Sequence, residues 1–177
     1  LDFEQSSMIK GRSVRMDHVL NKFRNQQIKL KNLSTRIFNG KSLVLSQTNP
    51  YQIIADYDKS KVRYYAAKNR KYREPLVFVA PLAINMSIYD LYPYRSLVHY
   101  FNESGFDVYL VDWGNLTYAD QELNFLYFID KALPFFIEKI REHSNSEQIS
   151  LHGWSMAGIF VLLYTAYRQP NYVKNLI

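Results

Sequence analysis

Residues 150–158 read SLHGWSMAG, and this stretch decides how the chain folds. It has the form of a short strand, a tight turn that carries Ser155, and the start of a helix. This is the G-x-S-x-G nucleophile elbow, with Ala157 in the place of the last glycine. Bulky side chains near the serine would collide in so sharp a turn, so we expect Gly153, Ala157 and Gly158 to shape the elbow. The motif predicts Ser155 as a nucleophile.

The residues that follow the turn are apolar. Residues 159–166 read IFVLLYTA, which predicts a buried helix whose N-terminus lies behind Ser155 and favours negative charge on a reacting oxygen. Such a serine also needs backbone N–H groups that bind the oxyanion. We expect one donor from Met156 and the other from the loop after residues 76–80, with Leu82 or Ala83 as candidates.

The partners that a catalytic serine needs do not follow it in the sequence. The histidines are His18, His99, His143 and His152, all before Ser155, and no His, Asp or Glu occurs after Gly158. A triad on this motif runs in the order Ser, Asp or Glu, His. We expect a structural role for His152, and we expect the base and the acid to lie beyond Ile177 in a longer enzyme.

The same reasoning predicts how the chain behaves by itself. A serine without its base retains only what the oxyanion donors and substrate binding supply. A sheet that lacks strands beyond the elbow would expose an apolar edge. We therefore expect residues 1–177 alone to be inactive as an esterase, and either poorly soluble or stable only when another chain complements the sheet.

Composition excludes several kinds of site. The 177 residues include no cysteine, which rules out disulfides, a thiolate zinc site and a cysteine nucleophile within this sequence. No apolar run approaches the about 20 residues of a membrane span. We expect no metal, no cofactor and a cytoplasmic location.

The net charge of +6 is concentrated near the beginning of the chain. Between Arg12 and Lys41 there are eight basic residues and one acid, Asp17. Apolar residues recur there near helical spacing, although Gln26 and Gln27 interrupt the stripe. Such a helix suits an anionic surface, a lipid boundary or an acidic partner, or it docks on the body of the protein. We expect no nucleic-acid partner, because no binding module accompanies the charge.

Strand and helix patterns alternate through the rest of the chain. Strands are predicted at 61–65, 76–80, 107–112 and 149–151, with a further strand opening at 173–177. Helices are predicted from about 93 to 102 and from about 118 to 143, the second kinked or divided at Pro134. This order predicts an α/β fold with a mostly parallel sheet. We expect residues 1–60 to form a basic helical segment and residues 61–177 the sheet domain.

Three stretches resemble one family. Residues 75–85 (PLVFVAPLAIN), 105–114 (GFDVYLVDWG) and 173–177 (VKNLI) are similar to polyhydroxyalkanoate synthases, in particular to the catalytic subunit of their two-subunit type. The resemblance covers roughly residues 60–177. It implies an α/β-hydrolase-fold acyltransferase that grows a polyester from hydroxyacyl-CoA, either as a homo-oligomer or with a partner subunit.

The chain departs from that family at its nucleophile. The family has a cysteine in a G-x-C-x-G-G box, and Ser155 stands at the matching position. A serine ester is more stable than a thioester, and a serine needs stronger base assistance. Hydroxyacyl transfer and hydrolysis of an ester or polyester therefore both remain open. A non-enzymatic alternative is a relative that binds a polyester granule or lipid surface.

Overall fold

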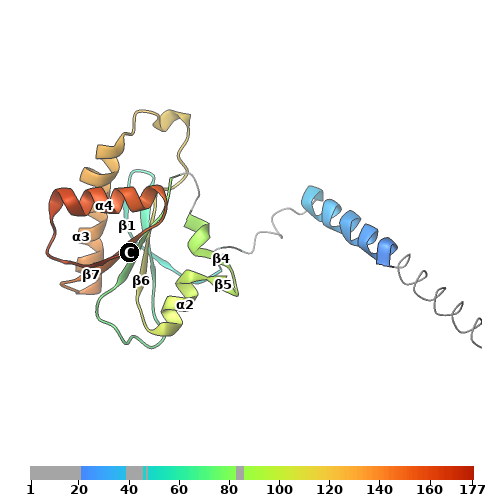
Figure 1. Ribbon diagram of the computed structural model, residues 1–177, viewed down its shortest axis with the longest axis horizontal. Coiled ribbons are helices and arrows are strands. Elements are labelled where there is room, and N and C mark those ends of the chain that lie inside the picture. Colours follow the sequence, from blue (N-terminus) through green and yellow to red (C-terminus); the bar gives the residue numbers. More distant parts are fainter. Residues whose placement is uncertain (1–20, 39–45, 47, 83–85) are drawn as a thin grey trace, which may run out of the picture. The chain divides into compact units, whose positions relative to one another are not determined.

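The computed structural model describes residues 21–38, 46, 48–82 and 86–177, and it divides into two units at the boundary between residues 45 and 46. The second unit contains a six-stranded sheet with the strand order β1-β2-β6-β3-β7-β8 (Figure 1). The strands are β1 (Gln52–Tyr57), β2 (Ser60–Tyr65), β3 (Leu76–Val79), β6 (Val108–Asp112), β7 (Ile149–Gly153) and β8 (Val173–Leu176).

The sheet is antiparallel at one edge and parallel elsewhere. β1, β2 and β6 pair antiparallel, whereas β6, β3, β7 and β8 run parallel. Every residue of β3 and β6 is buried. Burial on both faces explains why these strands are continuous apolar runs rather than alternating ones. The four strands predicted from the sequence, and the strand opening at 173, are confirmed.

Helices cover both faces of the sheet (Figure 1). α2 (Leu97–Ser104) contacts β6, and the Phe78 ring of β3 meets the Phe101 ring of α2 at 5.8 Å between centroids. α3 (Leu133–Ser144) contacts β1 and β2, and α4 (Met156–Arg168) contacts β3 and β7. The α/β fold predicted from the sequence is therefore confirmed.

The predicted helix at 93–102 begins later than expected. Residues before it form a small hairpin of β4 (Asp90–Tyr92) and β5 (Arg95–Ser96), after the 3-10 helix η2 (Met86–Tyr89). The Ser96 hydroxyl accepts a hydrogen bond from the His99 N–H at 3.0 Å and so caps the helix. Gly105, at φ 101°, ends it in the left-handed conformation.

The predicted helix at 118–143 is interrupted. A 3-10 helix, η3 (Tyr118–Asp120), is separated from a π-helix, η4 (Tyr127–Ala132), which continues directly into α3. Pro134 has no N–H to donate, and the N–H of Leu133 bonds to the Phe128 carbonyl five residues back. Pro134 therefore lies where the π-helix passes into α3 and does not divide the helical segment, whose interruption falls earlier, at residues 121–124.

The boundary between the units differs from the predicted one after residue 60. β1 pairs with β2 along residues 52–64, so both strands belong to the sheet unit. β1 has exposed positions, such as Gln52 and Ile53, so its sequence does not show the apolar pattern of a buried strand.

α4 is less buried than its apolar sequence suggested. Ala157, Phe160, Val161 and Tyr164 face the sheet and are almost fully buried. On the other face, Ile159, Leu162, Leu163 and Tyr167 are exposed. Their exposed fractions range from 42% for Leu163 to 73% for Tyr167.

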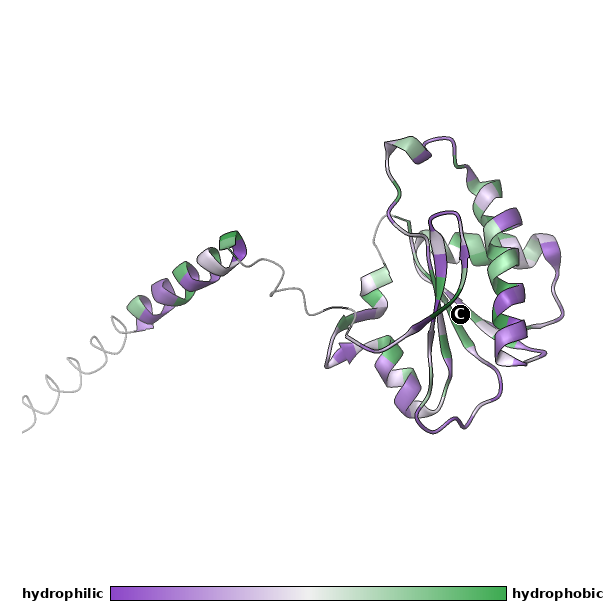
Figure 2. Ribbon diagram, turned by 180° about the vertical axis from the view of Figure 1, so that it is seen from behind, coloured by the Kyte–Doolittle hydropathy of each residue, from purple (hydrophilic) through white to green (hydrophobic). Residues whose placement is uncertain are grey.

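The first unit is described as a helix over residues 21–38. Hydrophobic and hydrophilic residues are interleaved along it (Figure 2). None of the helices in the described ranges combines the length and the apolar character needed to cross a membrane.

Candidate active site at the carboxyl end of the sheet

Ser155 lies in a strained turn between β7 and α4. Its backbone has φ 57° and ψ −128°, a conformation that residues other than glycine rarely adopt. Such strain costs about 1–3 kcal/mol and persists only where the surrounding packing holds it. The side chain of Ser155 is exposed, at the carboxyl end of the parallel strands. This is the geometry that the elbow motif predicts.

The small residues around the turn allow β7 and α4 to pack closely. A Cβ atom on Gly153 would lie 2.5 Å from the Ala157 carbonyl oxygen and 2.7 Å from a methyl of Val161. A Cβ on Gly158 would approach only the Gly153 carbonyl oxygen, at 3.2 Å. The strand and helix therefore fit only because residue 153 has no side chain. Gly158 contributes much less to this fit.

One of the predicted oxyanion donors directly follows the serine. Met156 is the first residue of α4, so its N–H has no acceptor within the helix. Leu82 follows β3 and is half-buried, and Pro81 before it has no N–H. Ala83, the other predicted donor, lies outside the described residues.

Two aromatic residues hold the end of β3 in place. The Tyr89 hydroxyl donates to the Val79 carbonyl at 2.9 Å, and the Trp113 indole N–H donates to the Ala80 carbonyl at 2.5 Å. Burial raises the pKa of Tyr89, partly offset by a hydrogen bond from the backbone of Trp154, next to the nucleophile. Tyr89 thus links the β3 loop to the elbow. Neither role is predicted from the sequence, in which the only signal is that these segments are rich in aromatic residues.

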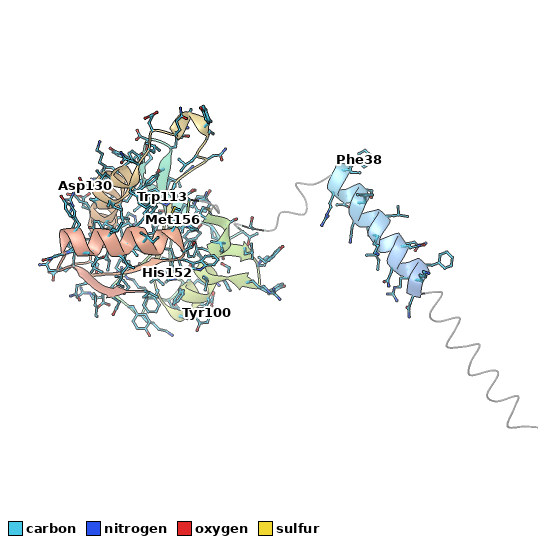
Figure 3. All side chains as sticks on the ribbon, turned by 45° about the horizontal axis from the view of Figure 1, so that its top comes forward. Phe38, Tyr100, Trp113, Asp130, His152 and Met156 are labelled. Carbon is cyan, nitrogen blue, oxygen red and sulfur yellow. The ribbon has the colours of Figure 1, made fainter. Side chains whose placement is uncertain are left out.

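A pocket of about 300 Å³ opens at the ends of β3 and β6. Its lining residues are Ala80, Pro81, Leu82, Met86, Asp112, Trp113, Gly114, Asn115 and Leu116. β3 lies directly between β6 and β7, and Val79 pairs with Gly153. The pocket is therefore one strand away from the turn that carries Ser155. Trp113, His152 and Met156 are labelled in Figure 3.

A buried ion pair supports this pocket. The Arg63 guanidinium donates to Oδ2 of Asp112 from Nε at 3.1 Å and from a terminal nitrogen at 2.7 Å. The other carboxylate oxygen accepts from the Gly114 N–H at 3.0 Å. Both side chains are about one-tenth exposed. The pair fixes β2 to the end of β6 where the chain turns into the pocket wall.

His152 lies on the opposite face of β7 from α4. Its ring packs edge-on against Phe78 at 5.1 Å and near Tyr89 at 5.8 Å between centroids. Its Nδ1 is buried and has no hydrogen-bond partner among the residues that the structure describes. Burial lowers the pKa of His152. These contacts favour the structural role that the sequence analysis expected.

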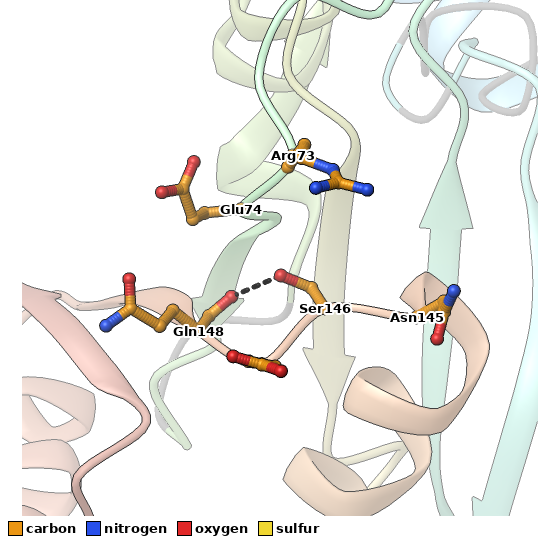
Figure 4. Close-up of a pocket in the computed structure, with 6 residues that line it drawn as sticks. Arg73, Glu74, Asn145, Ser146 and Gln148 are labelled. Carbon is orange, nitrogen blue, oxygen red and sulfur yellow. Dashed lines mark hydrogen bonds between the residues drawn. The ribbon is translucent and has the colours of Figure 1, made fainter.

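A larger pocket lies at the opposite end of the sheet. It has a volume of about 450 Å³ and is lined by Arg73, Glu74, Asn145, Ser146, Glu147 and Gln148 (Figure 4). These residues precede β3 and β7, at the amino ends of the strands. Ser146 donates to the Gln148 carbonyl at 2.7 Å, a bond within the loop itself. No strained backbone is found among these residues except Asn145, which ends α3 at φ 48°.

The part of the chain that the structure describes places no group of three or more His, Cys, Asp or Glu where it could hold a metal ion.

Comparison with known proteins agrees with this geometry. The sequence model of the α/β hydrolase fold matches residues 83–177. A poly(3-hydroxyalkanoate) polymerase subunit PhaC from Haloferax mediterranei is 31% identical over 128 residues, which are 72% of this chain and 26% of that protein. The PhaC subunit of Synechocystis is 34% identical over 103 residues, which are 58% of this chain and 27% of that protein. The chain spans about a quarter of the length of these relatives.

A solved structure shows the same fold. A thermostable carboxyl esterase from Bacillus coagulans superposes with a TM-score of 0.51 at 14% identity, over 72% of this chain and 42% of the esterase. The chain therefore belongs to the α/β-hydrolase fold family, and within that family its sequence is similar to the poly(3-hydroxyalkanoate) polymerase subunits.

Proposed function

We propose that this chain carries the nucleophile of a poly(3-hydroxyalkanoate) synthase-like acyl-transfer enzyme, and that Ser155 attacks the carbonyl of a hydroxyacyl thioester. The observation that carries the proposal is the backbone of Ser155, at φ 57° and ψ −128° between β7 and α4. A strained serine, exposed at the carboxyl ends of parallel strands, is the geometry that presents a nucleophile in this fold. The similarity to polymerase subunits supports the substrate class.

The proposed reaction forms an acyl-enzyme. The Ser155 oxygen bonds to the carbonyl carbon while its proton passes to a base, and the oxyanion is bound by the Met156 N–H and a donor of the β3 loop. Collapse of the intermediate breaks the carbon–sulfur bond and releases the thiol. The acyl group then passes to the hydroxyl of a growing chain. We assign the base to no residue of this chain, because His152 packs against Phe78 and Tyr89.

A second candidate is hydrolysis of an ester or polyester. Serine, rather than the cysteine that the resemblance to synthases implies, favours it. An oxygen ester at Ser155 exchanges less readily than a thioester would, so water can compete as the acceptor. The two candidates share every step up to the acyl-enzyme and differ only in what accepts the acyl group.

The test uses the gene product that carries this sequence, with Ser155→Ala and Ser155→Cys variants. Each is assayed with 3-hydroxybutyryl-CoA, measuring thiol release and polymer, and with a p-nitrophenyl ester. Loss of the nucleophile should lower turnover at least about 10³-fold. Ser104→Ala on α2 is the matched control, since that hydroxyl bonds only within its own helix, to the Tyr100 carbonyl.

The outcomes separate the candidates. Polymer formation by the parent protein supports transfer, and faster thioester turnover by Ser155→Cys strengthens that assignment. Ester cleavage without polymer supports hydrolysis. Equal turnover of parent and Ser155→Ala with both substrates would remove Ser155 from the mechanism.

A further inference from the structure

The helix over residues 21–38 is strongly and uniformly basic. It contains five cationic side chains and no Asp or Glu, and the cations are Lys22, Arg24, Lys29, Lys31 and Arg36. A helix of this charge is attracted to any anionic surface, over a range set by the salt concentration. The charge alone does not tell which kind of anionic surface the helix binds, but the arrangement of its apolar side chains does.

The apolar side chains occupy one arc of this helix. At about 3.6 residues per turn, the large apolar residues fall within an arc of about 140°. They are Phe23, Leu30, Leu33, Ile37 and Phe38. All five are exposed, from 55% for Leu33 to 87% for Phe38, and Phe38 is labelled in Figure 3. Ile28 is the one large apolar residue of the helix outside the arc.

The cations line both borders of the apolar arc. Lys22, Lys29 and Arg36 are spaced seven residues apart along one border. Arg24 and Lys31, also seven apart, follow the other border. Long basic side chains in this position can keep their apolar stems at a lipid boundary while their charges reach the headgroups. A helix lying in the plane of a bilayer surface requires this arrangement.

Polar residues within the arc limit how deeply it can insert. Ser34 lies there, and its hydroxyl donates to the Lys31 carbonyl at 2.8 Å, so that group is satisfied by the helix itself. Gln26 and Gln27 also fall within the arc, one near each border. These residues suit the boundary between headgroups and acyl chains rather than the bilayer interior.

The charge pattern also distinguishes between occupants. A second copy of the helix would place five cations against five cations with no acid to pair them, which opposes self-association. A nucleic acid would neutralise the cations but leave five large apolar side chains in water. The surface of an anionic bilayer offers headgroup charges to the cations of both borders and acyl chains to the apolar arc.

We propose that helix 21–38 is an in-plane anchor that binds the surface of an anionic phospholipid bilayer. The inference goes beyond the acyl-transfer function and does not depend on it, because it is argued from the charge and the exposed apolar side chains of the helix alone.

The test is flotation of the gene product that carries this sequence with vesicles. One set is phosphatidylcholine with about 30% phosphatidylglycerol and the other is phosphatidylcholine alone. Binding should occur on the anionic set at about 50 mM salt and fall sharply at about 500 mM salt, where charges are screened within a few ångströms. Circular dichroism of every variant checks that its helix and sheet content is retained.

Two triple variants separate the charge from the apolar arc. Lys22→Gln, Lys29→Gln and Arg36→Gln together should weaken binding about 100-fold, at about fivefold per cation. The matched control is Lys68→Gln, Lys71→Gln and Lys131→Gln, three exposed lysines of the sheet unit, and it should bind within about twofold of the parent. Leu30→Gln, Leu33→Gln and Ile37→Gln keep the charge and should also abolish flotation.

Several results would overturn the proposal. Equal losses in the two charge variants would show that net charge alone drives binding. Equal binding to neutral and anionic vesicles, or flotation by the apolar-arc variant at parent levels, would remove the anchor. Binding to polyester particles but not to vesicles would assign the helix to a granule instead. Ser155→Ala should bind vesicles as the parent does, which keeps this test separate from that of the nucleophile.

Discussion

The carboxyl end of the parallel strands carries the Ser155 turn and a pocket of about 300 Å³, whereas the amino end carries a larger pocket of about 450 Å³. At the carboxyl end the backbone is strained, and the Arg63–Asp112 ion pair beneath the pocket is buried. At the amino end the pocket is lined by solvated side chains, and the nearby pair of Lys174 and Glu74 is partly exposed. The volume of the pocket alone would therefore select the amino end, whereas backbone strain and the buried ion pair select the carboxyl end, where Ser155 lies.

The contrast has a physical reason. The loops at the carboxyl ends of parallel strands can carry the side chains and N–H groups of a site. The N-terminus of α4, where the helix dipole is positive, also points toward this site. The loops at the amino end only connect each helix to the next strand, so the charged residues there can stay in contact with water.

The largest expected effect on stability is the difference between breaking the buried ion pair at the carboxyl end and breaking the exposed one at the amino end. Arg63→Met leaves Asp112 buried and uncompensated, and should lower the free energy of unfolding by about 3–5 kcal/mol. Lys174→Gln at the amino end should lower it by less than about 1 kcal/mol, because that pair is solvated. Urea unfolding measures both. Similar losses in the two variants would erase the contrast between the ends.

Gly153→Ala should have the next largest effect. The added methyl would meet the Ala157 carbonyl oxygen and Val161, so we expect a loss of about 3 kcal/mol and displacement of the elbow. Gly158→Ala is the matched control, since its one close approach is 3.2 Å and alanine favours the helix. Thermal unfolding of the pair checks this. The close packing at the turn would be refuted by a Gly153→Ala protein as stable as Gly158→Ala.

Replacing Ser155 by glycine should stabilise the protein while removing its nucleophile. Glycine adopts φ 57° without strain, and after its own entropic cost we expect a gain of about 1 kcal/mol. Ser155→Ala should show no such gain, because alanine keeps the strain. A glycine variant no more stable than the alanine variant would mean that the turn stores no strain.

The smallest effect should be a pH dependence that involves His152. Burial lowers the pKa of this residue from 6.5, so the folded protein binds its proton less readily than the unfolded chain does. Stability should be unaffected by this residue above about pH 6.5 and should fall as the pH drops below that value. Unfolding of the parent and of His152→Gln between about pH 5 and 8 should show a shallower acid slope for the variant. Identical slopes would contradict the burial of this imidazole.

Local patterns explain which parts of the structure could be predicted. The elbow at 150–158 and the strands at 76–80 and 107–112 depend on glycine spacing and apolar runs, which are visible over a few residues. β1 was missed because it is an edge strand with exposed positions. Tyr89 and Trp113 could not be identified as anchors of the β3 loop, because the carbonyls that they bind are 10 and 33 residues away.

The most direct test of the central claim is to locate the acyl group on the protein. The gene product that carries this sequence is mixed with 3-hydroxybutyryl-CoA or a p-nitrophenyl ester, quenched with acid, digested and mapped by mass spectrometry. We predict an acyl group on the peptide that contains Ser155, and none on that peptide in Ser155→Ala. An acyl group on another residue, or undiminished turnover in Ser155→Ala, would contradict the assignment of Ser155 as the nucleophile.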